Sequence, residues 1–219
     1  MKPQLFAHPF SSYCQKALIA LYENDIDFDY LFVGPEKPDV LERLGKLWPM
    51  RKFPILVDGE RTILEATTIV EHLAVHHPGP MTLIPQDPAI AVEVRMLDRV
   101  FDNYVMTPMS KMVFDAIVPA ESRDPYGVAA ARTSLDTIYA WLDARMADRE
   151  WAVGDAFSLA DCAAAPSLFY ADWAHEIPAE HAHLRAYRAR LLARPSFARA
   201  VDEAREFRAY FPLGAPDRD

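Results

Sequence analysis

The hydrophobic periodicity of the chain changes once, near residue 78, and this change limits the possible folds. Before it, strand-like and helix-like runs follow the order β-α-β-α-β-β-α. Residues 77–88, HPGPMTLIPQDP, contain four prolines and have the composition of a linker. Only helical spacing follows. We therefore predict an α/β domain at residues 1–78, a linker at 79–88 and an all-helical domain at 89–219.

Composition excludes several classes of protein. The 219 residues carry a formal charge of −9 with no basic block, which argues against nucleic-acid binding. No segment approaches the ~20 apolar residues of a membrane span, and the first residues lack the apolar run of a signal peptide. Two cysteines, Cys14 and Cys162, are fewer than a secreted disulfide scaffold normally has. We expect a soluble cytoplasmic protein that binds neither nucleic acid nor membrane.

The common cofactor and metal motifs are missing from the sequence. The scattered glycines form neither a P-loop nor a dinucleotide-binding turn. His72 and His76 lie four residues apart on a predicted helix, but no zinc motif accompanies them, so a solvated surface pair is the favoured interpretation. We predict no metal cofactor.

The segment HPFSSYCQKALIAL, residues 8–21, follows a predicted strand and has the apolar spacing of a helix. Ser11 stands where that helix begins, so its hydroxyl and the free N–H groups of the first turn are close together. Such a helix start can bind an anion. The alternative is that Ser11 or Ser12 only caps the helix.

Two later segments carry related signals. In KFPILVDG, Pro54 stands at the start of a strand, and a cis bond there would present the backbone of Phe53 to an extended peptide. A trans proline on an edge strand is the alternative. In ILEATTIVEHL, Glu65 precedes a helix, so it and the N–H groups of Ala66 and Thr67 suit the head group of an α-amino acid. Glu65 could instead only stabilise the helix N-terminus.

The segment FSLADC specifies another helix start. Ser158 and Asp161 have the spacing of a capping box, and Phe157 can pack on Cys162 as a hydrophobic staple. This pattern predicts a stable helix in the second half of the chain and no catalytic role.

Together, these features resemble the glutathione transferase family over essentially the whole chain. The resemblance implies a thioredoxin-like domain followed by a helical-bundle domain. The letters SSYC are most similar to the bacterial serine-type, theta- and zeta-like members. By that match the Ser11 hydroxyl stabilises the thiolate of glutathione, the cosubstrate, and Ser12 is a close competitor. Cys14 is expected to be a small buried residue, with a reactive thiol as the alternative.

The same resemblance implies the remaining glutathione contacts. Phe53, before a cis Pro54, would bond the cysteinyl backbone. Glu65 and Ala66 match an acidic-plus-serine pair that holds the γ-glutamyl group, but the serine is replaced by Ala66. Thr67 would replace the lost hydroxyl, or affinity would be weaker.

Lys52 and Lys37 match positions that often reach the ligand carboxylates, with ordinary exposed lysines as the alternative.

Lowering a thiol pKa from ~8.5 to ~6.5 requires ~2.7 kcal/mol and raises the thiolate fraction from ~3% to about three-quarters at pH 7.

The resemblance further implies that the thiolate attacks a small hydrophobic electrophile. Tyr104 and Met112, with Met106 and Met109, would form an apolar wall, or the methionines would be core. A cytoplasmic homodimer with a role in detoxification is expected. The alternatives are a glutathione-dependent isomerase, dehalogenase or peroxidase, and a non-catalytic glutathione-binding module.

Overall fold

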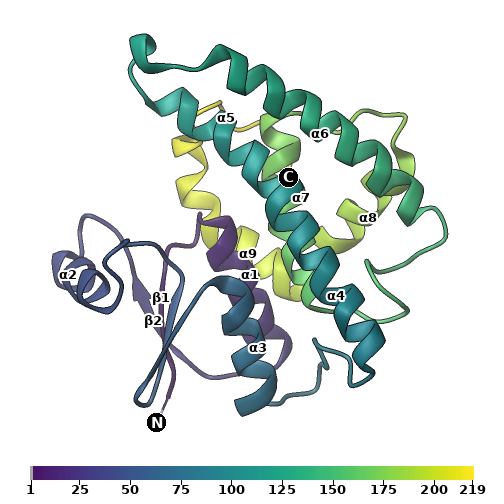
Figure 1. Ribbon diagram of the computed structural model, residues 1–219. Helices are drawn as coiled ribbons and strands as arrows, with labels where there is room; N and C mark the ends of the chain where they lie inside the picture. The colour runs from purple at the N-terminus through teal and green to yellow at the C-terminus, as the bar shows by residue number, and fades with distance from the viewer. Residues whose placement is uncertain (1) are drawn as a thin grey trace.

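The computed structural model describes residues 2–219 and contains one small sheet followed by helices (Figure 1). The first part contains β1 (Gln4–Ala7), α1 (Ser12–Glu23), β2 (Asp29–Phe32), α2 (Pro38–Leu47), β3 (Ile55–Asp58), β4 (Arg61–Leu64) and α3 (Ala66–His76). This order confirms the predicted α/β unit. No helix or strand lies between His76 and Pro88, a span that overlaps the linker predicted at 79–88.

Every main element after Pro88 is a helix. They are α4 (Pro88–Val100), α5 (Thr107–Ile117), α6 (Pro125–Met146), α7 (Leu159–Ala174), α8 (Ala182–Leu192) and α9 (Pro195–Ala204), with η1 (Phe101–Met106), η2 (Ala120–Ser122) and η3 (Arg205–Tyr210) as short π- or 3₁₀-helical segments. The predicted fold class, a thioredoxin-like α/β part followed by an all-helical part, is therefore confirmed. None of the helices within residues 2–219 is both long enough and apolar enough to cross a bilayer.

The sheet has the strand order β2-β1-β3-β4. β1 runs parallel to β2 and antiparallel to β3, and β3 and β4 form an antiparallel hairpin. The predicted hairpin is confirmed, but its turn differs from the expected one. Asp58 is still paired with Arg61, and of the turn residues only Gly59 has a positive φ, of 62°. Glycine adopts this conformation without a Cβ penalty.

Helices cover both faces of the sheet (Figure 1). α2 packs on one face over a small cluster that includes Phe6, Leu44 and Ile55. On the other face, α1 packs between α3 and the helices α7 and α9. This second cluster continues into the helical part, so the two parts of the chain share one large hydrophobic core. α1 consequently packs against both parts of the chain.

A proline interrupts the regular bonding of the helix that contains α4 and α5. Sequence reasoning expects Pro108 to kink or end this helix. The chain instead continues through the π-helical segment η1, in which the Thr107 N–H donates to the Asp102 carbonyl five residues earlier. Pro108 has no N–H to donate, and the wider π-turn accommodates its ring. The helix therefore continues past the proline with a π-bulge.

The capping box at the start of α7 is present. The Asp161 carboxylate accepts hydrogen bonds from the Ser158 N–H and the Ser158 hydroxyl, each at 2.9 Å. Phe157 and Cys162 are both buried in the large core, as a hydrophobic staple requires. Asp161 also accepts bonds from the Ala152 N–H and the Tyr187 hydroxyl, so one buried carboxylate organises three segments of the chain.

Candidate functional site

A cleft of about 160 Å³ lies where β3 and α3 begin. Five predicted site residues line it together with three others; the full set is Tyr13, Trp48, Lys52, Phe53, Pro54, Leu64, Glu65 and Ala66. These residues come from α1, from the loop before β3 and from the junction of β4 with α3. The fold thus brings the segment around Pro54 and the segment around Glu65 to one cleft.

The Phe53–Pro54 peptide bond is cis. This geometry agrees with the sequence expectation, and the trans alternative is wrong. The ladder between β1 and β3 begins only at Ile55, and within residues 2–219 the backbone of Phe53 forms no hydrogen bond. The Phe53 N–H and C=O at the cleft wall are therefore available to another extended chain.

Glu65, which also lines the cleft, has an unusual backbone conformation. Its φ of 66° and ψ of 128° place a non-glycine residue in a region that costs of order 1–3 kcal/mol. The side chain is exposed and does not cap α3. The Glu65 carbonyl accepts the first helical bond, from Ile69, so the N–H groups of Ala66 and Thr67 have no intrahelical partner. A carboxylate beside two free N–H groups can receive the ammonium and carboxylate of an amino acid.

Ser11 caps α1 and is not among the residues that line the cleft, although Tyr13, two residues later, lines it. Its φ and ψ are extended, and its hydroxyl accepts the Cys14 N–H at 3.4 Å, a long bond. Ser12 is the first helical residue. Both serines are half-buried. Ser11 therefore caps the helix. Because its hydrogen bond with the Cys14 N–H is long, the Ser11 hydroxyl can turn towards another acceptor.

Cys14 is fully buried, as the sequence suggests. Burial raises the pKa of its thiol to about 12, so the thiol stays protonated at neutral pH. A reactive Cys14 thiolate is thereby disfavoured.

Sequence reasoning missed Tyr13, which lines the cleft directly. Burial raises the pKa of the Tyr13 phenol to about 12, and the Asp102 carboxylate adds to the rise. The phenol is therefore a hydrogen-bond donor over the physiological pH range. The available signal was its position in SSYC, two residues after the helix cap, where a side chain lies beside the helix start. Trp48 was also missed, and its helical spacing gave no such signal.

Thr67 cannot replace the hydroxyl that Ala66 lacks, because its own hydroxyl is engaged elsewhere. Thr67 Oγ1 accepts a hydrogen bond from Lys16 Nζ at 2.8 Å and donates to the Asp98 carboxylate at 3.0 Å. It also contacts the Arg99 guanidinium. The Thr67 backbone N–H remains free for a ligand.

The other predicted contacts are more dispersed. Lys52 lines the cleft, whereas Lys37 is exposed at the N-terminus of α2, outside the lining.

Tyr104 is 56% exposed and lines a separate apolar hollow with Val100 and Trp141, between η1 and α6. Met112 is 1% exposed and packs in the core with Met106 and Met109, so the expectation of an open methionine wall is corrected to core packing.

An aromatic cluster missed in the sequence lies next to Ser11. The Ser11 N–H donates to the His8 carbonyl at 3.0 Å, and the His8 ring contacts Phe32 and Phe207 at centroid distances of 5.0 and 4.6 Å. Burial lowers the pKa of His8, which favours the neutral ring. Phe207 belongs to η3, so the C-terminal segment supplies an apolar wall near the start of α1.

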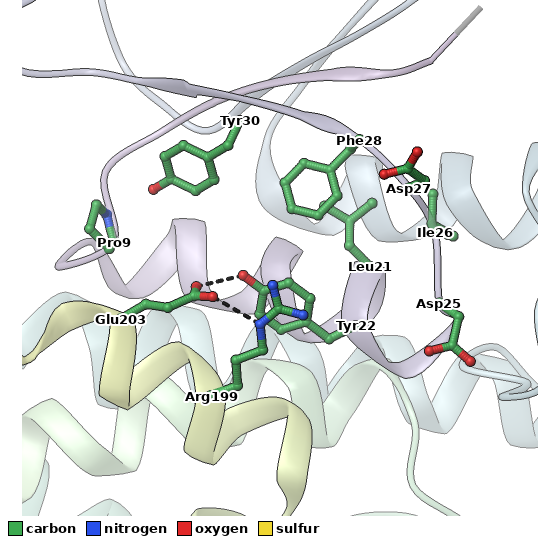
Figure 2. Close-up of a pocket in the computed structure, with 10 residues that line it drawn as sticks. All are labelled: Pro9, Leu21, Tyr22, Asp25, Ile26, Asp27, Phe28, Tyr30, Arg199 and Glu203. Atoms are coloured by element: carbon green, nitrogen blue, oxygen red, sulfur yellow. Dashed lines mark hydrogen bonds and ion pairs between the residues drawn. The ribbon is translucent and has the colours of Figure 1, made fainter.

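A larger hollow, of about 610 Å³, lies along α1 and is lined by Pro9, before the helix, and by Asp25, after it (Figure 2). It contains no predicted site residue. Its polar groups bond one another: the Tyr22 hydroxyl donates to Glu203 at 2.6 Å, and Arg199 Nε donates to Glu203 at 2.9 Å. The smaller cleft is the better candidate, because its Phe53 and α3 backbone groups are unpaired.

Comparisons with known proteins agree on one family. The family models described as the N-terminal and C-terminal domains of glutathione S-transferase match residues 5–81 and 105–195, which together span more than half of the chain. A glutathione S-transferase of Silene vulgaris is 25% identical over 216 residues, covering 92% of this chain and 97% of the relative.

A crystal structure and a second relative extend the comparison. A glutathione S-transferase of Methylobacterium radiotolerans, in complex with glutathione sulfonate, has a TM-score of 0.79 and 27% identity, covering 92% of this chain and 95% of that one. A stringent starvation protein A homolog of Coxiella burnetii is 25% identical and covers 91% of each chain.

Proposed function

Because this chain belongs to the glutathione S-transferase family, we propose that it binds glutathione in the cleft between Phe53 and Glu65 and transfers its thiolate to a small hydrophobic electrophile. The observation that carries the proposal is the meeting of the cis Pro54 loop with the strained Glu65 at one cleft. The relative solved with glutathione sulfonate supports a ligand of this class.

Each part of the tripeptide has a chemical partner in this proposal. The cysteinyl backbone pairs with the backbone of Phe53, and the γ-glutamyl group meets Glu65 and the N–H groups of Ala66 and Thr67. Lys52 meets a carboxylate. Lys37 remains a predicted contact that depends on a longer reach from α2.

The sulfur is placed at the start of α1. Free N–H groups, the helix dipole and a charge-assisted hydrogen bond from Ser11 favour the ionised thiol there. Together they supply the ~2.7 kcal/mol that a shift of two pKa units requires. The electrophile approaches from the aromatic side formed by His8, Phe32 and Phe207, with Tyr104 as a more distant predicted contact.

Substitution of the neighbouring hydroxyls tests the sulfur contact. We expect Ser11→Ala to reduce conjugation of glutathione to an aryl halide by about 10- to 100-fold, because a hydrogen bond to a charged group is worth ~1.5–3 kcal/mol. The ultraviolet thiolate absorbance of bound glutathione should titrate at a higher pH. Ser12→Ala is the matched control and should change little.

Other outcomes of the same experiment would change the assignment. A large loss in Ser12→Ala alone moves the role to Ser12. A large loss in Tyr13→Phe alone moves it to the phenol in the cleft. Unchanged thiolate titration in all three variants would reject a role for these hydroxyls.

A non-catalytic glutathione-binding module is the second candidate. One observation favours it: the missing hydroxyl at Ala66. Retention on immobilised glutathione without conjugation across a panel of electrophiles would support this candidate. Conjugation that Ser11→Ala removes would reject it. Turnover confined to a dehalogenation, isomerisation or peroxide-reduction assay would instead support those chemistries on the same site.

The proposal includes a cytoplasmic homodimer. Val92 and Met96 are exposed apolar residues one turn apart on α4, so they lie on the same helix face. Both cysteines are free and buried, which suits a reducing compartment. Light scattering coupled to size-exclusion chromatography tests the dimer. A Val92→Asp and Met96→Asp double variant should shift the mass to that of a monomer.

A further inference from the structure

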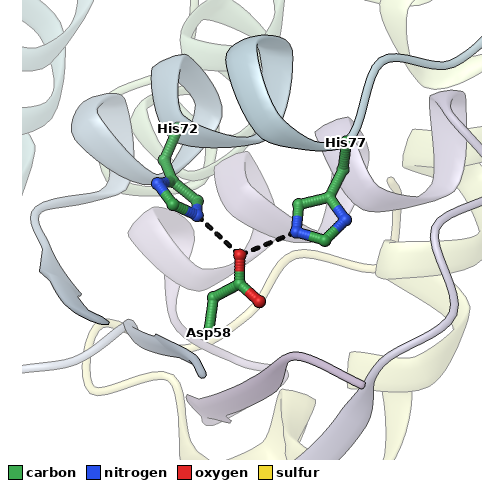
Figure 3. A group of neighbouring side chains, drawn as sticks. All are labelled: Asp58, His72 and His77. Carbon is green, nitrogen blue, oxygen red and sulfur yellow. Dashed lines mark hydrogen bonds and ion pairs between the residues drawn. The ribbon is translucent and has the colours of Figure 1, made fainter. Parts of the chain in front are cut away.

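Three ligand-type side chains converge at the end of the hairpin opposite to the cleft (Figure 3). His72 Nε2 lies 2.8 Å from Asp58 Oδ2, and His77 Nε2 lies 2.7 Å from the same oxygen. The sequence pairs His72 with His76 as a solvated surface pair; the two rings do pack together, with centroids 4.4 Å apart, but the expected solvation is wrong for His72. Its side chain is only 8% exposed and faces His77 across Asp58.

We propose that Asp58, His72 and His77 bind one divalent transition-metal ion, with Zn²⁺ as the ion that the donor set fits best. Two imidazole nitrogens and one carboxylate oxygen form a ligand set that zinc uses in sites with an open fourth position. Imidazole also suits copper, nickel and iron, whereas magnesium and calcium prefer sites made of oxygen ligands. None of these three side chains belongs to the proposed glutathione site.

The cluster needs little change to take the ion. Zinc–nitrogen and zinc–oxygen bonds of ~2.0–2.2 Å place neighbouring ligand atoms about 3.4 Å apart in a tetrahedron. The two imidazole–carboxylate distances must therefore lengthen by roughly 0.6 Å, which side-chain rotation can supply. In the metal-free cluster each Nε2–H donates to Asp58. Binding moves each ring proton to Nδ1 and frees the Nε2 lone pair, without net proton release from the rings.

The exposure of the cluster suits a metal ligand set. The side chains of Asp58 and His77 are 15% and 27% exposed, so a water molecule can occupy the fourth position. Arg61 is the nearby cation: its guanidinium lies 3.4 Å from His76 Nε2.

A bound ion would join two elements of the sheet-containing part. Asp58 ends β3, whereas His72 and His77 lie at the C-terminal end of α3. Glu65 stands at the other end of α3, which has 11 residues and is therefore about 16 Å long. The ion would stabilise the packing of the hairpin on α3 without touching the glutathione cleft.

The test uses the full chain treated with EDTA and kept free of glutathione, because a thiolate is itself a zinc ligand. Titration calorimetry with Zn²⁺ should show one ion per chain. Thermal unfolding should shift upwards with Zn²⁺ and return to its original midpoint with EDTA, as expected when a ligand binds the native state. No saturable binding by the wild-type chain would overturn the proposal.

Matched histidine variants locate the site. His72→Gln and His77→Gln should each weaken Zn²⁺ binding by at least about 10-fold, the scale seen even for loss of outer-shell partners. His76→Gln is the control: the His76 ring packs on the ring of His72 at a centroid distance of 4.4 Å, but its nitrogens face Arg61, so this variant loses packing without losing a ligand and should bind Zn²⁺ more tightly than either ligand variant. Equal loss in all three variants, or unchanged binding in the His72→Gln and His77→Gln double variant, would overturn the assignment.

A measurement without substitutions covers the case in which a variant fails to fold. Co²⁺ bound to the wild-type chain should give strong visible absorption, and its paramagnetism should shift the ring-proton resonances of two histidines. Shifts of two imidazole rings displaced by added Zn²⁺ would support the site. Shifts confined to His181 and His183 would overturn it.

Discussion

Lys16 Nζ lies 2.8 Å from Asp102 Oδ2, and this contact joins α1 to the π-helical segment η1 across the centre of the molecule. Asp98 forms a second ion pair with the same ammonium group. Lys16 is 1% exposed and Asp98 fully buried. Arg99 bonds both carboxylates, so the four charges sum to zero. The network is consistent with the rule that buried charges are paired.

We expect Lys16→Met to destabilise the protein by about 3–5 kcal/mol, because it leaves two buried carboxylates without their ammonium partner. Urea denaturation followed by circular dichroism measures the change. Lys46→Met is the matched control, since Lys46 pairs with Glu42 on the surface of α2, and it should have little effect. Equal effects of the two substitutions would contradict a special role for the buried network.

Glu65→Gly should separate stability from binding. Glycine adopts the backbone conformation of Glu65 without strain, which stabilises the folded state. Glycine also loses more backbone entropy on folding, but we expect the relief of strain to equal or exceed this cost. We therefore expect stability to be unchanged or to rise by up to about 1 kcal/mol, while glutathione affinity falls. Glu65→Gln should lower affinity without any gain in stability. A clear loss of stability in Glu65→Gly would argue that the backbone is not strained.

Asp161→Asn should destabilise the protein by about 2–4 kcal/mol, because the amide group would face donors that now bond a carboxylate. Those donors are the Ser158 N–H and hydroxyl, the Ala152 N–H and the Tyr187 hydroxyl. Asp87→Asn is the control: Asp87 caps α4 on the surface, and asparagine caps equally well. Thermal unfolding of both variants checks the contrast.

The Asp58 cluster should make stability depend on pH even without metal. The folded-state pKa of Asp58 lies below its unfolded value of ~3.9. Its contribution is therefore fully present above that value and is lost as pH falls through the lower, folded-state pKa. In EDTA, the difference in unfolding midpoint between the wild type and Asp58→Asn should be largest near pH 7 and shrink as pH falls below 4. A difference independent of pH would contradict the ionic contribution.

Local patterns predicted the elements of this chain well. The alternation of strand and helix spacing, the hairpin at Gly59 and the capping box at Ser158 each depend on residues close together in sequence. Pro54 and Glu65 could be linked to one cleft because both stand at element boundaries. Whether Ser11 contacts the sulfur stays a prediction, since no ligand contact defines it.

Contacts between distant segments could not be predicted in the same way. Lys16 lies beside the apolar positions of α1 and would be solvated if only one face of the helix were covered. It is buried because α3, α7 and α9 surround α1. His72 packs on the ring of His76, as its spacing suggests, but its Nε2 also bonds Asp58, because the hairpin end lies against α3. Tyr13 lines the cleft through the rotation of α1 on the sheet, which sequence spacing does not fix.

The π-bulge before Pro108 holds one residue more than an α-helical turn does. Deleting one position within Phe101–Met106 would therefore restore an ordinary α-turn and leave α5 in phase with α4. It would also remove the wide turn that accommodates Pro108, so the proline ring would then meet the carbonyl four residues before it. The extra residue and the proline are thus two features of this helix that can only be gained or lost together.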